Sequence, residues 1–432
     1  MTPGGVLKGW YHGWNIVTVC VLAGIASNAI PINAYSLFLH NWAAEWHAPI
    51  STLQLGIGAM GLGSALLAPL AGILVDRYSK RMLLAIGLTG MALSCFALSF
   101  ANQLWEYLAI YVVPIPGSLL LSATLVSNAV VSRWFVRHLG LALSITAVGL
   151  SLAGIVMPPL VAALLPTLGW RGIWRWDGIL TALVILPLAV AVLRDRPAAR
   201  HGTYYLEGAA TAASHAGHGV PAGSGVSGLR WRDILTHRTF WVLVIAYVPM
   251  IAVYGGCGQN IPPIAAARGF SSHTAGVLLS ILSLSQLSMT MLAGVAADRF
   301  GNRLPLVALS LLTAVGGVLI ALSGGIVTLG IGVALVACGG SFWPPLTAVI
   351  ARDFGAAGIG RVFGLVMFFL PVATILGPFG VARVQEAIGS YTTPLLAISA
   401  LSVVGALACG SFLRDSRPAD MGDTGATAKA NA

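Results

Sequence analysis

Residues 72–81 read GILVDRYSKR and residues 294–303 read GVAADRFGNR, so one short charged pattern occurs twice, about half a chain length apart. A second pattern repeats at nearly the same offset, as Arg137, Gly140 and Leu141 and again as Arg361, Gly364 and Leu365. Each copy of the first pattern joins two long apolar runs through a short charged turn, which is how consecutive membrane helices are connected. The sequence therefore predicts a duplicated membrane unit.

The composition excludes a water-soluble globule. Of the 432 residues, 57% are hydrophobic and 8% are charged, which leaves too few charged side chains to cover a hydrated surface. A spanning helix needs roughly 20 apolar residues. We therefore predict an all-α integral membrane protein with twelve transmembrane helices in two pseudo-symmetric six-helix bundles. The expected spans are about 14–39, 52–75, 82–101, 106–132, 140–164, 173–193, 239–262, 273–296, 304–323, 326–350, 362–386 and 391–413.

Composition also divides the chain. We expect an N-terminal six-helix bundle over residues 1–194, a cytoplasmic linker over 195–238, a C-terminal bundle over 239–414 and a cytoplasmic tail over 415–432. The linker is rich in Ala, Gly, Ser and His with scattered arginines, which is typical of a flexible connection. Its histidines, His201, His215 and His218, lack metal-ligand spacing, and no metal site is expected.

The motif content argues against an enzyme. The sequence has no nucleophile elbow, phosphate-binding loop or zinc-binding His/Glu spacing, so no catalytic site and no cofactor are expected. The five cysteines lie in apolar runs without a C-x-x-C pair, which indicates small buried side chains rather than disulfides or a redox centre.

Charge predicts the orientation. With both termini in the cytoplasm, four of the 23 lysines and arginines fall on the outer side, namely Arg171, Arg175, Arg268 and Arg383. This bias satisfies the positive-inside rule. We expect a multi-pass protein of the plasma membrane, or of the inner membrane in a bacterium. The formal net charge of +10 then reflects topology and contact with the lipid bilayer, not a nucleic-acid partner.

The run from Gly72 to Arg81 resembles the signature between helices 2 and 3 of the major facilitator superfamily, with Ser79 where that family usually has glycine; the second copy supplies the glycine as Gly301. Other features resemble its monocarboxylate and oxalate/formate porter branch: Arg133-Trp134-Phe135 leading into Gly140-Leu141-Ala142, Gly169-Trp170-Arg171, and Phe240-Trp241. The resemblance covers the whole chain. It implies a secondary active transporter that works by alternating access.

The resemblance also implies a conformational latch. An aspartate at one helix end gains stabilisation from the positive N-terminus of another helix in one conformation and loses it when the halves rock. Asp76 would thus hold the outward-facing state against the helix start near Gly364. The residues expected in both latches are Gly72, Asp76, Arg77, Arg81, Arg133, Asp298 and Arg299. The alternative is that these charges anchor loops at lipid headgroups.

A transported solute should meet polar groups near mid-bilayer, because polar groups that face lipid there cost several kcal/mol. The candidates cluster around helix breakers such as Pro31 and Pro114, or share one helix face. The expected solute-binding residues are Asn28, Asn33, Tyr35, Ser118, Ser122, Tyr247, Tyr254, Gln286, Thr290, Trp343 and Phe369. For each serine, a hydrogen bond to its own helix or packing between helices is the alternative role.

The branch resemblance breaks at the positions that would read substrate charge. Monocarboxylate transporters carry a lysine just after a helix 1 proline, and an acid and an arginine on helix 8. Counted from Pro31 and Gly294, these positions hold Ile32, Gln286 and Thr290. Without a cationic partner, an anion would be costly to desolvate. The favoured solute is a small organic molecule, a monocarboxylate or aromatic organic acid that crosses in its neutral form or among hydrogen-bond donors.

Proton coupling is expected from the family alone, since no carboxylate or histidine lies in the middle of a predicted helix. His40 and His273, at outer helix ends, are peripheral candidates for the co-transported proton. One alternative is a facilitator or exporter of a neutral or hydrophobic molecule. A channel or a membrane sensor is the alternative of another class, but a channel would not explain duplicated latches and a sensor would need a signalling domain. For the oligomeric state, we expect a monomer.

Asp76→Asn is expected to impair solute uptake while leaving expression intact, because it weakens a charge–dipole contact at a helix end by on the order of 1 kcal/mol. The population should shift toward inward-facing states. Labelling of single cysteines introduced into the cavity measures this shift. Unchanged uptake together with unchanged labelling would remove the latch hypothesis.

Overall fold

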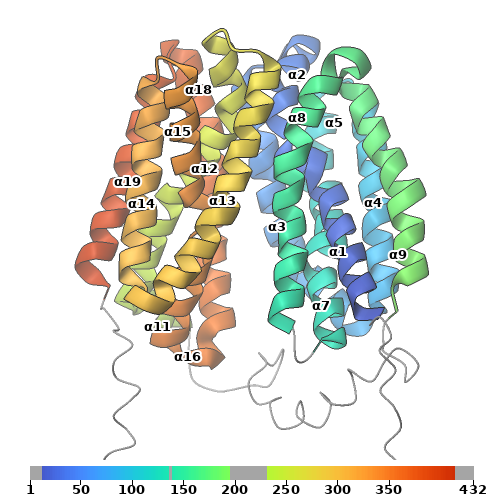
Figure 1. The fold of residues 1–432 in the computed structure, drawn as a ribbon, viewed down its shortest axis with the longest axis horizontal. Helices are drawn as coiled ribbons and strands as arrows, with labels where there is room; N and C mark the ends of the chain where they lie inside the picture. The colour runs from blue at the N-terminus through green and yellow to red at the C-terminus, as the bar shows by residue number, and fades with distance from the viewer. Residues whose placement is uncertain (1–11, 136–138, 195–230, 414–432) are drawn as a thin grey trace, which may run out of the picture. The chain divides into compact units, whose positions relative to one another are not determined.

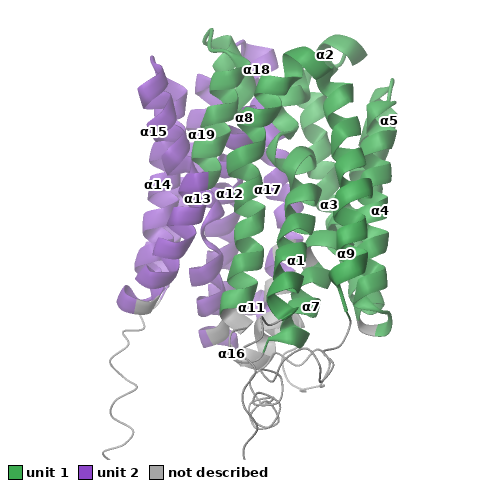
Figure 2. Cartoon of the chain, turned by 45° about the vertical axis from the view of Figure 1, so that its right-hand side comes forward, with its two compact units in different colours: residues 1–222, 261–283 green, residues 223–260, 284–432 purple. Residues whose placement is uncertain are grey.

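The computed structural model of the chain describes residues 12–135, 139–194 and 231–413, and every regular element in these ranges is a helix. The chain forms two compact units (Figure 2). Unit 1 comprises residues 1–222 and 261–283, and unit 2 comprises residues 223–260 and 284–432. The segment 261–283, which the sequence assigns to the C-terminal bundle, packs with unit 1: for example, the Ser280 hydroxyl donates to the Ile155 carbonyl oxygen.

In unit 1, long helices run side by side along one axis (Figure 1). Several are interrupted by π-helical or 3-10 segments, which are labelled η. The elements are α1 (His12–Asn28), η1 (Ala29–Asn33), η2 (Tyr35–Phe38), α2 (Leu39–Trp46), α3 (Ile50–Arg77), α4 (Lys80–Ser99), α5 (Leu104–Val112), α6 (Pro114–Leu119), η3 (Leu120–Thr124), α7 (Leu125–Trp134), α8 (Leu139–Leu180), η4 (Thr181–Ile185) and α9 (Leu186–Val192).

Unit 2 has the same all-helical character. It holds most of α12 and the second half of α13. The elements from residue 231 onward are α11 (Trp231–Thr236), α12 (Arg238–Ala267), α13 (Ser272–Phe300), α14 (Arg303–Leu322), α15 (Ile326–Val336), η6 (Ala337–Gly340), α16 (Trp343–Phe368), α17 (Leu370–Leu376), α18 (Pro378–Ile388) and α19 (Thr392–Phe412).

The repeated sequence pattern corresponds to a repeated pair of helices. In the first copy, α3 has 28 residues and α4 has 20; in the second, α13 has 29 and α14 has 20. The turns differ in detail. Ser79 caps α4 by accepting a hydrogen bond from the Met82 amide, whereas Gly301 adopts a φ of 78° that favours glycine. Serine can therefore replace glycine in the first turn.

Ten helical stretches in the described part of the chain are long and apolar enough to cross a membrane. They account for the twelve expected runs as follows. The runs at 140–164 and 173–193 lie in a single stretch, Leu141–Val192, which turns at Gly169. The run at 362–386 is divided among the end of α16, α17 and α18, and thus lacks one uninterrupted helix of spanning length.

Large apolar side chains face outward along these helices, as lipid requires. Leu183, Met291 and Val327 are 71%, 69% and 71% exposed. Each unit encloses its own apolar core, with Leu88, Val126 and Trp134 in unit 1. Leu243, Phe342 and Val366 lie in the core of unit 2. Glycine allows the helices of a unit to approach closely, which is the usual packing mode of membrane helices.

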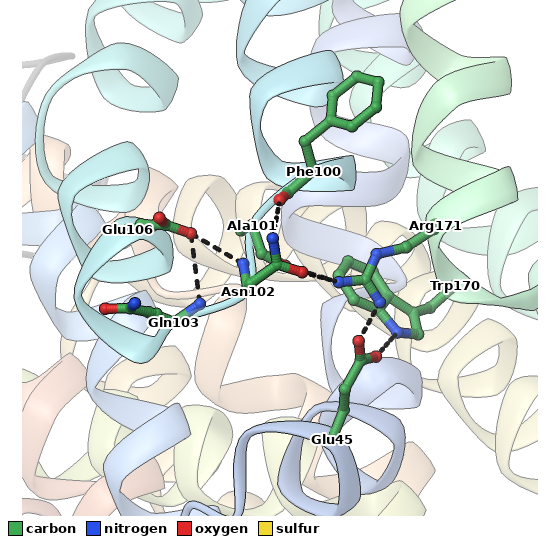
Figure 3. Close-up of polar contacts among 8 residues, drawn as sticks. All are labelled: Glu45, Phe100, Ala101, Asn102, Gln103, Glu106, Trp170 and Arg171. Carbon is green, nitrogen blue, oxygen red and sulfur yellow. Dashed lines mark hydrogen bonds and ion pairs between the residues drawn. The ribbon is translucent and has the colours of Figure 1, made fainter.

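A polar cluster holds the turn of α8 in place (Figure 3). The Trp170 indole donates to Glu45 on α2 at 2.7 Å, and the Arg171 guanidinium forms an ion pair with the same carboxylate. Arg171 also donates to the Ala101 carbonyl and the Asn102 side chain, both at 2.8 Å. The Gly169-Trp170-Arg171 motif therefore joins α2, the turn after α4 and the second limb of α8.

Gly169→Ala is expected to destabilise the protein by about 1 to 3 kcal/mol, because φ 64° and ψ 169° lie in a region that side chains with a Cβ avoid. Thermal unfolding in detergent measures the change. Gly72→Ala is the matched control: it lies within α3, and a Cβ there would meet nothing within 4 Å. The control should retain or gain stability, and equal losses in both variants would contradict this account of the turn.

Candidate functional site

The largest polar cluster among the expected solute-binding residues lies in unit 2, where α12 and α13 face the interruption between α15 and α16. The Tyr254 hydroxyl donates to Oε1 of Gln286 at 2.6 Å, and Nε2 of Gln286 reaches the Gly340 carbonyl at 3.4 Å. The Thr290 and Ser341 hydroxyls lie 3.1 Å apart. Both donate to the backbone carbonyl oxygen of Gln286, at 2.8 and 3.1 Å respectively. We call Tyr254, Gln286, Thr290 and Ser341 the Gln286 node.

The local sequence explains why the node forms there. The sequence predicts one helix over 326–350, but the structure interrupts it: α15 ends at Val336, a 3-10 turn follows, and α16 begins at Trp343. Glycine admits the neighbouring side chains, because a Cβ at Gly340 would lie 2.6 Å from Nε2 of Gln286 and one at Gly339 would lie 2.8 Å from Cβ of Tyr254. The backbone groups freed by the interruption are then bonded by uncharged side chains.

Tyr247 lies next to this interruption. Its ring packs against Phe342 and Trp343, with centroids 4.6 and 6.2 Å away. The side chain is 1% exposed, and its hydroxyl has no hydrogen-bond partner among the described residues. By contrast, Phe369 contacts Phe240 and Trp241 at the start of α12. The structure therefore brings Trp343 to Tyr247 and places Phe369 against the first residues of α12, before Tyr247.

In unit 1 the polar candidates gather where helix 1 breaks at Pro31. The break is a π-helical turn, η1, followed by a 3-10 turn. Nδ2 of Asn28 donates to the Gly24 carbonyl at 2.9 Å, and Nδ2 of Asn33 donates to the Asn28 carbonyl at 3.1 Å. Both side chains are partly exposed, and their amide oxygens remain available as acceptors.

The other unit 1 candidates are engaged inside the unit. Tyr35 is fully buried; its hydroxyl contacts that of Tyr107 at 2.6 Å and also donates to the Leu53 carbonyl. Ser122 is fully buried and bonded to Ser27 at 2.7 Å and to the Ser118 carbonyl at 2.7 Å. These contacts match the packing role that the sequence left open for each serine.

The expected latch is described only in part. The arginines of both latches, Arg77, Arg81, Arg133 and Arg299, are exposed, whereas Lys80 is buried and donates to the Tyr78 carbonyl at 3.2 Å. The side chains of Asp76, Asp298 and Arg361 lie outside the described part, as do the surroundings of Gly364, Arg137 and the linker histidines. The latch therefore remains a prediction.

The two peripheral histidines lie at helix starts. His40 is on α2, where partial burial lowers the pKa of its imidazole below the usual value. Its neutral form is therefore favoured near neutral pH. His273 is exposed at the start of α13. Among the described residues, no group of three or more His, Cys, Asp or Glu side chains could hold a metal ion.

Several residues of the site are missing from the sequence-based prediction. Ser341, Gly339, Gly340 and Phe342 complete the surroundings of Gln286 and Tyr247. A signal was present in the sequence: Gly339-Gly340 and Pro344-Pro345 lie close together inside an apolar run, and paired Gly or Pro residues mark breaks. Hydropathy alone does not detect this interruption.

Helices of spanning length with an uncharged polar node at a helix interruption are the architecture of a multi-pass membrane protein. The sequence model of the Major Facilitator Superfamily matches residues 18–271 and 258–431. The chain therefore belongs to the Major Facilitator Superfamily.

Curated relatives are distant. The chain is 25% identical over 190 residues to the uncharacterized MFS-type transporter YcxA of Bacillus subtilis (44% of this chain, 46% of that protein). It is 27% identical over 237 residues to an MFS-type transporter of Aspergillus fumigatus (54% and 53%), so it spans about half the length of these two relatives. Human monocarboxylate transporter 11 is 24% identical over 360 residues (78% and 70%).

Solved structures show the same fold. The partially occluded, inward-open xylose transporter XylE of E. coli superposes with a TM-score of 0.70 at 15% identity, over 94% of this chain and 98% of that one. The human organic anion transporter MFSD10 gives a TM-score of 0.60 at 19% identity, over 92% and 99%. These similarities support the architecture and leave the substrate open.

Removal of a hydroxyl from two tyrosines of α12 should have opposite effects on stability. Tyr247→Phe should raise the thermal stability of the solute-free protein, since a buried hydroxyl without a partner is lost, while Tyr254→Phe should lower it, since the bond to Gln286 is lost. Each change is expected to be about 1 kcal/mol. Thermal unfolding in the same detergent measures both. Shifts of the same sign would contradict the two assigned environments.

Proposed function

We propose that this transporter moves a small organic solute by alternating access, with a monocarboxylate or aromatic organic acid as the favoured substrate class and a proton as the coupled ion. The observation that carries the proposal is the Gln286 node, which is uncharged and lies where a membrane helix is interrupted; Tyr254, Gln286 and Thr290 are partly exposed. Interrupted helices near mid-membrane are common solute sites in transporters. The similarity to human monocarboxylate transporters 11 and 6 supports the substrate class.

The node recognises hydrogen-bonding groups rather than charge. Its members supply amide and hydroxyl groups, which can donate to or accept from a solute. A carboxylate that entered without water would lack a cation there, which is costly. The protonated acid avoids this cost, because its hydroxyl donates and its carbonyl accepts. An acid that crosses in its protonated form carries a proton with it, and its transport is therefore coupled to the proton gradient.

An uncharged solute is the second proposal, and the same neutrality of the node favours it. A facilitator or exporter of a neutral or hydrophobic molecule would need no cation at Gln286. The two proposals differ in the dependence of transport on pH and on solute charge. A channel or a membrane sensor receives no support from the family or from the fold.

The remaining organisation is proposed on the charge distribution and the family. We place both termini and residues 195–238 in the cytoplasm, with the chain acting as a monomer in the plasma membrane or a bacterial inner membrane. The two six-helix halves would rock around the solute, and Asp76 and Asp298 with their neighbouring arginines would stabilise the alternative states.

Uptake into proteoliposomes should show that Gln286 orients the solute. The panel comprises monocarboxylates, aromatic acids and their neutral amides, each with and without an imposed pH gradient. Gln286→Ala should weaken transport of the best solute by roughly 1 to 3 kcal/mol, because a desolvated polar group of the solute loses its partner. Gln286→Glu should impair acids and amides alike, because the protonated acid, like the amide, carries no charge for the new carboxylate to repel.

Ser288→Ala is the matched control, since Ser288 is exposed on the same helix and bonds to the Leu284 carbonyl of its own turn. It should transport normally. Normal transport by Gln286→Ala would place the solute site elsewhere. A permanently charged dicarboxylate as the best substrate would overturn the neutral site.

A further inference from the structure

Unit 1 encloses a buried acidic side chain, that of Asp177. Asp177 lies on the second limb of α8, six residues beyond Arg171, which corresponds to about 9 Å of helix axis. Arg171 belongs to the charged cluster at the turn of α8 (Figure 3). Asp177 is 6% exposed and therefore lies inside unit 1, farther along the helix than that cluster.

The surroundings of Asp177 supply little to stabilise a negative charge. Its Oδ2 accepts one hydrogen bond, from the Cys95 thiol of α4 at 3.4 Å, and a thiol is a weak donor. Within the described residues, no lysine or arginine forms an ion pair with it. A buried carboxylate without a cation is unfavourable, whereas the protonated acid carries no charge to desolvate.

The neighbouring ionisable groups do not change this balance. Arg175 donates to the Ser99 hydroxyl at 3.4 Å and lies over the Phe100 ring, and Arg171 is bonded to Glu45. Lys80 and Arg81 lie at the opposite end of α4 from Cys95, and Glu106 on α5 accepts hydrogen bonds from the Asn102 and Gln103 amides. The other groups are a thiol and phenols, which are neutral near pH 7. They are Cys95 on α4, Tyr107 and Tyr111 on α5, and Tyr35 on η2.

Asp177 is connected to the break of helix 1 through a cavity. It lines this cavity, of about 430 Å³, together with Ile30 of η1, and the rest of that wall is apolar. Ile30 precedes Pro31, whose carbonyl accepts a hydrogen bond from the Tyr111 hydroxyl at 3.2 Å. A change at Asp177 can therefore act on the segment that carries Asn28 and Asn33.

We propose that Asp177 is the proton-binding residue that couples a proton to transport, through the cavity it shares with Ile30 at the break of helix 1. The protonated acid is accommodated in the apolar surroundings beside Cys95. The ionised acid requires water, and so favours a conformation in which water reaches its carboxylate. The proton is taken up from the solution on one side and released on the other. The coupling role of Asp177 rests on the proposed transport function. The binding of a proton to Asp177 does not.

Infrared difference spectroscopy tests proton binding without any solute. Spectra of the purified protein in lipid, recorded across a pH titration, should contain a carboxylic-acid band that disappears on deprotonation. The band should be absent from Asp177→Asn and shifted in Asp177→Glu. Asp353→Asn is the control, since Asp353 pairs with Arg352 on α16; its spectrum should retain the band. A band that persists in Asp177→Asn would overturn the assignment.

Uptake in proteoliposomes tests the coupling. When one proton crosses with each solute molecule, a difference of one pH unit supports about tenfold accumulation. The wild-type chain and Asp353→Asn should show it. Asp177→Asn should lose it while retaining exchange of labelled for unlabelled solute. Gradient-driven accumulation by Asp177→Asn, or its absence from the wild-type chain, would overturn the coupling. If the wild-type chain transported no solute of the panel, the proposed function would fail while the infrared result would stand.

Discussion

Inside a bilayer, a backbone N–H or C=O without a partner costs several kcal/mol, and every helix interruption in this chain must meet that constraint. At the break of helix 1, the Tyr111 hydroxyl bonds the Pro31 carbonyl and Asn33 bonds the Asn28 carbonyl. At the break between α15 and α16, Gln286 reaches the Gly340 carbonyl and Ser341 reaches the Ala337 carbonyl. At both breaks, polar side chains therefore bond the backbone groups that the interruption frees, and we propose that a solute competes for the same side chains.

The same constraint separates charged from neutral groups. Charged pairs such as Glu45 and Arg171 lie at a helix turn, where they hold elements of unit 1 together. The Gln286 node, by contrast, bonds the interrupted backbone with amide and hydroxyl groups. Asp177 is the exception, a buried acid bonded to a thiol. In our proposal, a neutral solute site and a separate proton site in unit 1 divide between them the tasks that a charged site would combine.

The sequence predicts the helices well because apolar runs of spanning length have few alternatives in lipid. The duplicated pattern also predicts the matching pairs α3–α4 and α13–α14. The helix interruption at residues 337–342 was missed, because hydropathy does not register which apolar residues break a helix. The burial of the serines was missed as well: the spacing of Ser118 and Ser122 gives their helix face, but the hydroxyl of Ser122 is bonded to Ser27 from a distant segment. The pairing of Gln286 with Tyr254 likewise depends on tertiary contacts.

The central claim is that the solute site is uncharged, and equilibrium binding of benzoate and benzamide to the purified protein tests it most directly. The two probes share a ring and differ in the charge of one group. A neutral site should bind benzamide at least as tightly as benzoate near neutral pH, and benzoate should gain affinity as the pH falls toward its own pKa. Tighter binding of benzoate that grows as the pH rises would show a cation in the site and contradict the account.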